Sequence, residues 1–576
     1  MLLLQVGSSP PRNLDASTTQ GGKALSLTSD FQQCRQRRVK CDETRPSCLR
    51  CIRFKIDCDG YPAPKNPRYN TVHTERKLHP NPLKAGSYLV AMPSSELRFA
   101  DDLEERHFRN FQMETAAELS GIFDTTFWNR LLLQACHEEP FVKKIVMALS
   151  AVSTSKKLSL RTNSSAVERA INAQQTGFAL MQYQKALKEI RTSLASRADS
   201  RKAVIACLLV CCFESLLGNL ASAHAHALSG QKLLEQWLVQ HPYTRSCDVG
   251  IASPAQHLIE DDILKAGVFF DAQLLSFQDP RPAYIHAKLR LEGEEAIAQM
   301  PKRLKNIGEA HRYLFLSYKR VLHSCREIGE LCQDGRLSTT ADYKIVENGI
   351  EDLCLNPQLS TIGPTKQEVP VEASLIFTVQ QKGYLSELQR WRSAFSNLYE
   401  SIKLSSNKRL ISAADSLMAL SKTLDVCLYV SLDTDNCSCD HLSAEFHEIY
   451  ALSSEIASFI KSDHNHLNYS FELAVIPAIF VVSRFCRERE LRRKAITLLE
   501  KFEMSEGTWD SNFSAAFVRK LMELEEEGVE TEFVPEGARV RVINEIFHME
   551  RRICVMKYIR GTKRTGETTG EAVYYW

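Results

Sequence analysis

Five closely spaced cysteines constrain the N-terminal part of this chain more than any other feature. Their spacing is Cys34-x6-Cys41-x6-Cys48-x2-Cys51-x6-Cys58. Thiolates at this density are the ligands that tetrahedral zinc prefers. A segment this short cannot bury an apolar core, so metal binding is expected to supply its folding free energy. The alternative, a disordered basic loop with chance cysteines, does not account for the regular spacing.

Basic residues alternate with these cysteines and outnumber the acids between them. They are Arg35, Arg37, Arg38, Lys40, Arg45, Arg50, Arg53 and Lys55. The whole chain has a net charge of only +2, so it has no polyelectrolyte character. Any affinity for nucleic acid must therefore come from this local patch, where Lys and Arg can neutralise phosphates.

The segment CRQRRVKCDETRPSCLRCIRFKIDCDGY resembles the six-cysteine binuclear zinc cluster of fungal transcription factors. The resemblance implies two zinc ions held by six thiolates, of which the first and the fourth bridge both metals. The second to sixth ligands match Cys34, Cys41, Cys48, Cys51 and Cys58.

The same resemblance assigns roles in DNA recognition to the basic residues. Arg37, Arg38 and Lys40 occupy the stretch that approaches a CGG triplet in the major groove. The DNA-contacting residues expected from the resemblance also include Arg35, Arg45 and Arg50. Of these, Arg35 and Arg50 are expected to contact phosphates. The cofactor implied is zinc, and the partner implied is double-stranded DNA with CGG triplets.

The first cysteine of the family pattern is missing, because position 31 is Phe31. The missing ligand is a bridge, so each zinc loses one sulfur bond. The resemblance also ends abruptly upstream of Cys34. Residues 1–33 are therefore expected to be disordered, or else a mis-annotated segment from a wrongly joined exon. A genuinely degenerate cluster is the other interpretation.

Composition divides the rest of the chain into further segments. We expect a zinc cluster domain at 34–61, a proline-rich linker at 62–96, an all-helical regulatory domain at 97–560 and a C-terminal tail at 561–576. Pro140 suits a helix start, and Val142, Ile145, Leu149 and Val152 repeat on one helical face. Alternating strand patterns are nearly absent, so the fold class expected is stacked antiparallel helices.

Three stretches of the helical part resemble the regulatory region of many fungal zinc cluster factors. They are His107–Trp128, Arg201–Leu234 and Glu506–Gly528. The resemblance implies an effector or partner domain that often contributes to dimerisation. A single cluster covers only a triplet, so useful specificity calls for two half-sites. Dimerisation through the helical region and monomeric binding both stay open.

Other patterns carry weaker expectations. The remaining thirteen cysteines lie among apolar helical residues, which suits reduced, buried thiols. The longest apolar run, Ala203–Phe213, is about half a membrane span, so no membrane association is expected. We expect the run Arg484–Lys494 to be a solvated helix face. We expect a mobile acidic loop, and not a metal site, at Cys437, Cys439 and His441. No catalytic motif is present, so no enzyme is predicted.

The leading hypothesis is a sequence-specific DNA-binding regulator of RNA polymerase II transcription in the nucleus. Its partners would be CGG-containing DNA, a second copy in a homodimer, and the transcription machinery. The basic stretch Arg35–Lys40 would serve as an import signal. The alternative is a helical interaction protein with a degenerate cluster, which does not bind DNA and acts by titrating partners.

Overall fold

The structure of the protein is a computed structural model. It describes residues 49–55, 97–123, 126–159, 166–196, 199–276, 279, 281–333, 371–431, 433, 437–462, 469–548 and 551–576. The chain divides into two compact units, Met1–Ser94 and Ser95–Trp576, and each is described by itself. The predictions for residues 1–48 and 56–96, including the linker at 62–96, lie outside the described residues.

In the first unit the described part is one short helix, α2 (Leu49–Arg53). Two backbone hydrogen bonds close its last turn. Phe54 N donates to the carbonyl of Cys51 at 3.2 Å, and Lys55 N donates to that of Ile52 at 3.1 Å. The helix therefore carries Cys51 from the predicted ligand set and Arg50 from the predicted DNA contacts.

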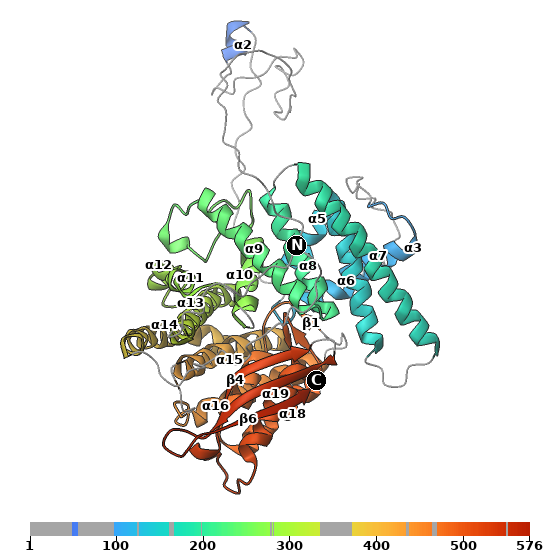
Figure 1. The fold of residues 1–576 in the computed structure, drawn as a ribbon. Helices are drawn as coiled ribbons and strands as arrows, with labels where there is room; N and C mark the ends of the chain where they lie inside the picture. Colours follow the sequence, from blue (N-terminus) through green and yellow to red (C-terminus); the bar gives the residue numbers. More distant parts are fainter. Residues whose placement is uncertain are drawn as a thin grey trace, which may run out of the picture. The chain divides into compact units, whose positions relative to one another are not determined.

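The second unit begins with helices that pack as successive neighbours (Figure 1). They are α3 (Asp102–Asn110), η1 (Phe111–Thr115), α4 (Ala116–Ser120), η2 (Phe127–Leu131), α5 (Leu132–Glu138), α6 (Pro140–Ser159), α7 (Ala166–Ser196), α8 (Ser200–Leu217), α9 (Leu220–Gln240) and the 3-10 turn η3 (Ser246–Asp248). Helix α6 packs against α7, and α8 packs against α9. The helix that starts at Pro140 is confirmed, and Val142, Ile145 and Leu149 are fully buried along it.

Further helices follow in the same manner. They are α10 (Asp261–Ser276), α11 (Ala283–Leu289), α12 (Glu294–Ala298), α13 (Ile307–Gln333), α14 (Val371–Lys403), α15 (Lys408–Val430), α16 (Ser443–Ser462), α17 (Ile476–Phe485), α18 (Arg489–Phe502), α19 (Ser511–Glu526) and the 3-10 turn η4 (Glu536–Ala538). Helix α13 contacts α10, α11, α14 and α15, so it is central to this part of the core. The predicted large helical region is confirmed.

A small sheet joins the helices near the C-terminal end. It consists of β1 (Tyr469–Ser470), β2 (Ser505–Glu506) and β3 (Trp509–Asp510), with β1 parallel and β3 antiparallel to β2. The buried Glu506 carboxylate accepts from the backbone N–H groups at the start of α17, including that of Val475 at 2.9 Å. This contact is a helix cap supplied from a distant strand.

The last residues differ from the expectation of an all-helical domain to 560 and a tail at 561–576. They form an antiparallel meander of β4 (Val540–His548), β5 (Ile553–Arg560) and β6 (Thr568–Tyr575). Both outer strands contact α19, and Figure 1 shows the sheet lying against this helix. Phe517 on α19 packs on Tyr574. The tail is therefore part of the core.

The second correction concerns the run Arg484–Lys494, predicted as a solvated helix face. Arg487 and Arg492 are buried and both pair with the buried carboxylate of Glu525 on α19. Glu525 also accepts from the N–H of Val540 at 2.7 Å. The run thus anchors α18 to α19 and to the meander. Arg493 and Lys494 remain exposed as predicted.

The thiols of the second unit are buried, as predicted, at most described positions. Burial raises the pKa of Cys136, Cys207 and Cys211 to about 12. Near the predicted mobile loop, Cys439 is also buried, and Arg539 Nη1 lies 2.9 Å from Cys437 Sγ. These contacts tie that loop to the start of the meander. Within the described ranges, no helix is long and apolar enough to cross a membrane.

Candidate functional site

The described part of the cysteine block is organised around a thiol rather than an apolar core. Cys51 is 1% exposed, whereas Leu49, Ile52 and Phe54 on either side of it are 59%, 57% and 60% exposed. A helix held by hydrophobic burial would show the reverse pattern. Burial of the sulfur with exposure of its apolar neighbours fits a segment folded around metal–thiolate bonds.

The other residues predicted for this site lie outside the described residues. They are the ligands Cys34, Cys41, Cys48 and Cys58 and the basic residues Arg35, Arg37, Arg38, Lys40 and Arg45. For Arg50 the structure gives the backbone, which lies in α2. Of the predicted zinc ligands, Cys51 is the one that lies within the described residues, so the ligand set as a whole stays a prediction.

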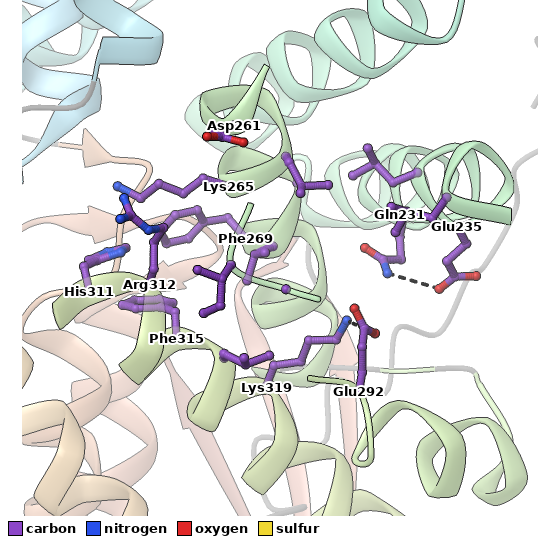
Figure 2. A pocket seen from close by; sticks show the side chains of 18 of the residues that line it. Gln231, Glu235, Asp261, Lys265, Phe269, Glu292, His311, Arg312, Phe315 and Lys319 are labelled. Carbon is purple, nitrogen blue, oxygen red and sulfur yellow. Dashed lines mark hydrogen bonds and ion pairs between the residues drawn. The ribbon is translucent and has the colours of Figure 1, made fainter. Parts of the chain in front are cut away.

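A second site, which the sequence did not predict, is a recess between three helices of the second unit (Figure 2). Its walls come from α9, α10 and α13 and from the connection that contains η3. Its cavity measures about 70 Å³, and the rest of the recess is open to solvent. The apolar lining includes Leu234, Leu238, Leu264, Val268, Phe269 and Phe315.

Charged side chains stand at different ends of this recess. In Figure 2, Lys265, His311 and Arg312 gather at one end, and Lys319 with Glu292 lies toward the other. Lys319 Nζ is 2.8 Å from Glu292 and 3.3 Å from Asp271, so its charge is already neutralised. Burial disfavours its ammonium form, yet these two carboxylates raise the pKa of Lys319 above its usual value.

At the opposite end, His311 is buried and neutral near physiological pH. Burial, with the positive charge of Lys265, lowers the pKa of His311 to about 4 against the opposing effect of Glu472. Arg312 lowers it further. Its Nε2 lies 3.3 Å from Glu472 Oε2, and its Nδ1 has no hydrogen-bond partner in the described part of the chain.

A buried network of ionisable side chains lies behind Lys319. Asp271 on α10 contacts Lys319, Arg281 and Nε2 of His323, the last at 3.0 Å. Nδ1 of His323 lies 2.8 Å from Nδ1 of His286, so one ring donates a hydrogen bond to the other. Although burial opposes ionisation, His323, Lys319 and Arg281 hold the pKa of Asp271 well below its usual range.

Asp279, His286 and His323 of this network approach one another closely enough to hold a metal ion. Arg281, however, pairs with Asp279 through two nitrogens and also contacts Asp271. The carboxylates are therefore already neutralised by protein cations, and we interpret the cluster as a structural ion network. No short-range spacing in the sequence reveals it, because its members are spread from α10 to α13.

Two family models match the chain. Residues 32–68 match the fungal Zn(2)-Cys(6) binuclear cluster domain, and residues 106–261 match the fungal specific transcription factor domain. The first match covers the cysteine block and the second covers α3 through α9. Both are families of transcription factors and not of enzymes. The zinc cluster predicted from the cysteine spacing is thereby supported as a zinc-binding domain.

Several curated proteins are similar to parts of the chain. The aspercryptin biosynthesis cluster-specific transcription regulator atnN of Emericella nidulans is 28% identical over 216 residues, which is 35% of this chain and 34% of that protein. Transcription regulator lscL of Purpureocillium lilacinum is 25% identical over 214 residues, 35% of this chain and 48% of that protein.

A shorter and stronger similarity covers only a small segment. The transcriptional regulatory protein moc3 of Schizosaccharomyces pombe is 59% identical over 29 residues, 5% of this chain and 6% of that protein. The chain thus spans about a third to a half of the first two relatives it matches. No solved structure matches it. The cysteine block and the helical region lead to one conclusion: the chain carries matches to both of the domains that characterise fungal zinc cluster transcription factors.

Proposed function

We propose that this protein is a sequence-specific DNA-binding regulator of RNA polymerase II transcription, which acts in the nucleus. The observation that carries the proposal is the cysteine block, where residues 32–68 match a zinc cluster domain and Cys51 is buried among exposed apolar neighbours. The relatives, named as transcription regulators, support the same function.

Zinc would be held by the thiolates of Cys34, Cys41, Cys48, Cys51 and Cys58, with two ions expected from the family. Bound zinc would supply the folding free energy of the segment. The protein's own side chains would then do the recognition. Phosphates would be neutralised by Arg35 and Arg50, and a guanine in a CGG triplet would accept two hydrogen bonds from Arg38.

The experiment is a mobility-shift titration of the full chain, with Phe31→Cys introduced to complete the ligand set, on CGG-containing and scrambled DNA. We expect Arg38→Ala to cost about 1–3 kcal/mol on the CGG site and to remove discrimination between the two DNAs. The matched variant Arg50→Ala should weaken both DNAs by similar factors. Equal, non-selective losses from both variants would assign base reading to another residue, with Lys40 the next candidate.

A second function, partner titration by a protein that does not bind DNA, is favoured by one observation. Phe31 replaces a bridging ligand of the family pattern. The same titration separates the two functions when it is run on the unaltered chain. Selective binding to CGG DNA supports the regulator, and the absence of any shift for the unaltered chain, with a shift for Phe31→Cys, supports the titrating protein.

A further inference from the structure

One edge of the C-terminal meander is formed by a flat, uninterrupted strand, β6. All eight residues of this strand pair in register with β5, from Thr568 to Tyr575. The strand contains no proline, no lysine and no bulge, which are features that usually prevent an edge strand from pairing with another chain. Val573 and Tyr575 on it are 43% and 68% exposed. The strand β6 is therefore a template on which a further strand can pair.

The hydrogen bonds to β5 identify the backbone groups that face this edge. Directly after β6, Trp576 N donates to the carbonyl of Arg552 at 3.2 Å. Hydrogen-bonded pairs alternate along an antiparallel ladder, so the even-numbered residues of β6 bond to β5. The residues whose N–H and C=O groups point outward are Thr569, Glu571, Val573 and Tyr575. None of these groups has a hydrogen-bond partner among the residues that the structure describes.

The opposite edge of the meander, formed by β4, is less suited to pairing. A bulge between Val542 and Asn544 interrupts its register with β5. At the start of the strand, Val540 N donates to the buried carboxylate of Glu525 at 2.7 Å. Bulges twist an edge strand away from further pairing. Of the two edges of this sheet, β6 is thus the one that can receive a strand.

The charges on β6 permit it to pair with a second copy of itself. Glu571 is the one charged residue of the strand, and Lys557 on β5 lies 3.2 Å from its carboxylate. In an antiparallel pair centred on Ala572, Glu571 lies opposite Val573 of the second copy. This register uses all four outward-facing residues, and each opposing pair can exchange two backbone hydrogen bonds. It also keeps Glu571 from lying directly opposite its own copy, which would be unfavourable.

We propose that β6 pairs edge to edge with β6 of a second copy of this chain and joins the two meanders into one antiparallel sheet. The edge needs an extended strand that has free backbone groups and apolar side chains at alternate positions, and β6 itself has these properties. The interface is isologous, with its two-fold axis at Ala572. A dimer also supplies the two clusters that two CGG half-sites require, and in that respect the inference rests on the proposed function.

The test is sedimentation velocity of the full chain without DNA, at concentrations from about 1 to 100 µM. One pair of edge strands buries less area than a permanent interface, so we expect a dimer with a dissociation constant of about 10 µM. Val573→Pro removes an N–H that points outward and is not used within the sheet. It should weaken the dimer by more than about tenfold and leave thermal unfolding of the chain unchanged.

Charge variants at the two edges test the same contact if the proline variant proves to be destabilised. Val573 and Ile546 lie on the same face of the sheet, on either side of Val555 on β5. Val573→Glu should weaken the dimer by about tenfold, because it places like charges opposite Glu571 of the second copy. The matched control Ile546→Glu should leave the dimer unchanged. Val573→Lys, which places opposite charges there, should dimerise at least as tightly as the unaltered chain.

Three results would overturn the proposal. The first is sedimentation of the unaltered chain as a monomer at every concentration. The second is a dimer whose affinity is the same in Val573→Pro and Val573→Glu as in the unaltered chain. The third is equal weakening by Val573→Glu and Ile546→Glu, or by Val573→Glu and Val573→Lys. Since no DNA is present, these outcomes are independent of whether the cysteine block binds CGG triplets.

Discussion

Cysteine has opposite roles in the two units of this chain. In the helical unit, burial raises the pKa of thiols such as Cys211 to about 12, so they stay protonated and pack as small apolar groups. In the cysteine block, the buried Cys51 is surrounded by exposed Leu49, Ile52 and Phe54. The same residue type therefore serves as core filling in one unit and as a proposed zinc ligand in the other.

The two units are expected to depend on different interactions for their stability. In the described part of the first unit, residues 49–55, the apolar side chains Leu49, Ile52 and Phe54 are exposed, and we propose that metal–thiolate bonds supply the folding free energy of this segment. The second unit has an extensive apolar core and adds buried ion networks around Asp271 and Glu525. Removing a thiol should therefore abolish function in one unit and only reduce stability in the other.

The largest effect is expected from the matched pair Cys51→Ser and Cys211→Ser. Cys51→Ser should lower affinity for CGG DNA by about a hundredfold or more, because a ligand that supplies folding free energy is lost. It should leave thermal unfolding of the helical unit unchanged. Cys211→Ser should keep DNA affinity and reduce the free energy of unfolding by about 1–3 kcal/mol, since it buries a hydroxyl. Similar losses of DNA affinity in both variants would contradict the proposed difference between Cys51 and Cys211.

A large effect is also expected at Asp271, within the helical unit alone. Asp271→Asn leaves Arg281 and Lys319 short of a buried counter-charge and should cost about 3–5 kcal/mol of unfolding free energy. Urea denaturation measures it. Asp262→Asn, on the same helix and without an ion pair among the described residues, is the control and should change stability by less than about 0.5 kcal/mol. Equal losses from the two variants would show that the network is not stabilising.

A smaller effect is expected in the pH dependence of stability. The pKa of His311 is lowered from its usual 6.5 to about 4, so the unfolded chain binds a proton in this window that the folded chain does not. The stability that comes from keeping His311 neutral is present above pH 6.5, and it is lost as the pH falls toward 4. His311→Phe, which keeps the ring stacked on Phe315, should reduce the loss of stability between pH 6.5 and 5 by about 1–2 kcal/mol.

The control for this prediction is His137→Gln, at an exposed histidine on α5. This change leaves the ring of His311 stacked on Phe315, so the loss of stability that His311 causes between pH 6.5 and 5 should persist. Parallel curves for His311→Phe and the unaltered chain would mean that His311 is not held neutral by burial.

Much of the fold could be predicted because its signals are local. The stripe of Val142, Ile145 and Leu149 has the helical period, and the helix begins at Pro140 as the sequence predicted. The terminal meander escaped prediction because β4 breaks its own two-residue period. A bulge between Val542 and Asn544 shifts the inward face, and the charged Glu545 is buried on it.

The candidate sites also differ in whether a local sequence pattern predicts them. The cysteine spacing is a local pattern, so the zinc cluster could be predicted from the sequence alone. The recess and the network around Asp271 join side chains from α9 to α13, and no spacing in the chain relates them. Arg492 illustrates the limit, because it is buried while its neighbour Arg493 is exposed, and tertiary packing against Glu525 decides the difference.

The central claim is that the cysteine block is a zinc cluster that reads DNA, and that Phe31 weakens it by removing a bridging ligand. The most direct measurement is the zinc content and the CGG-DNA affinity of the full chain with Phe31 and with Phe31→Cys. The account predicts two zinc ions per chain and tighter, chelator-sensitive DNA binding for Phe31→Cys, with less zinc and weaker binding for Phe31. Equal zinc content and equal affinity would contradict the bridging role, and the absence of zinc from both proteins would contradict the cluster itself.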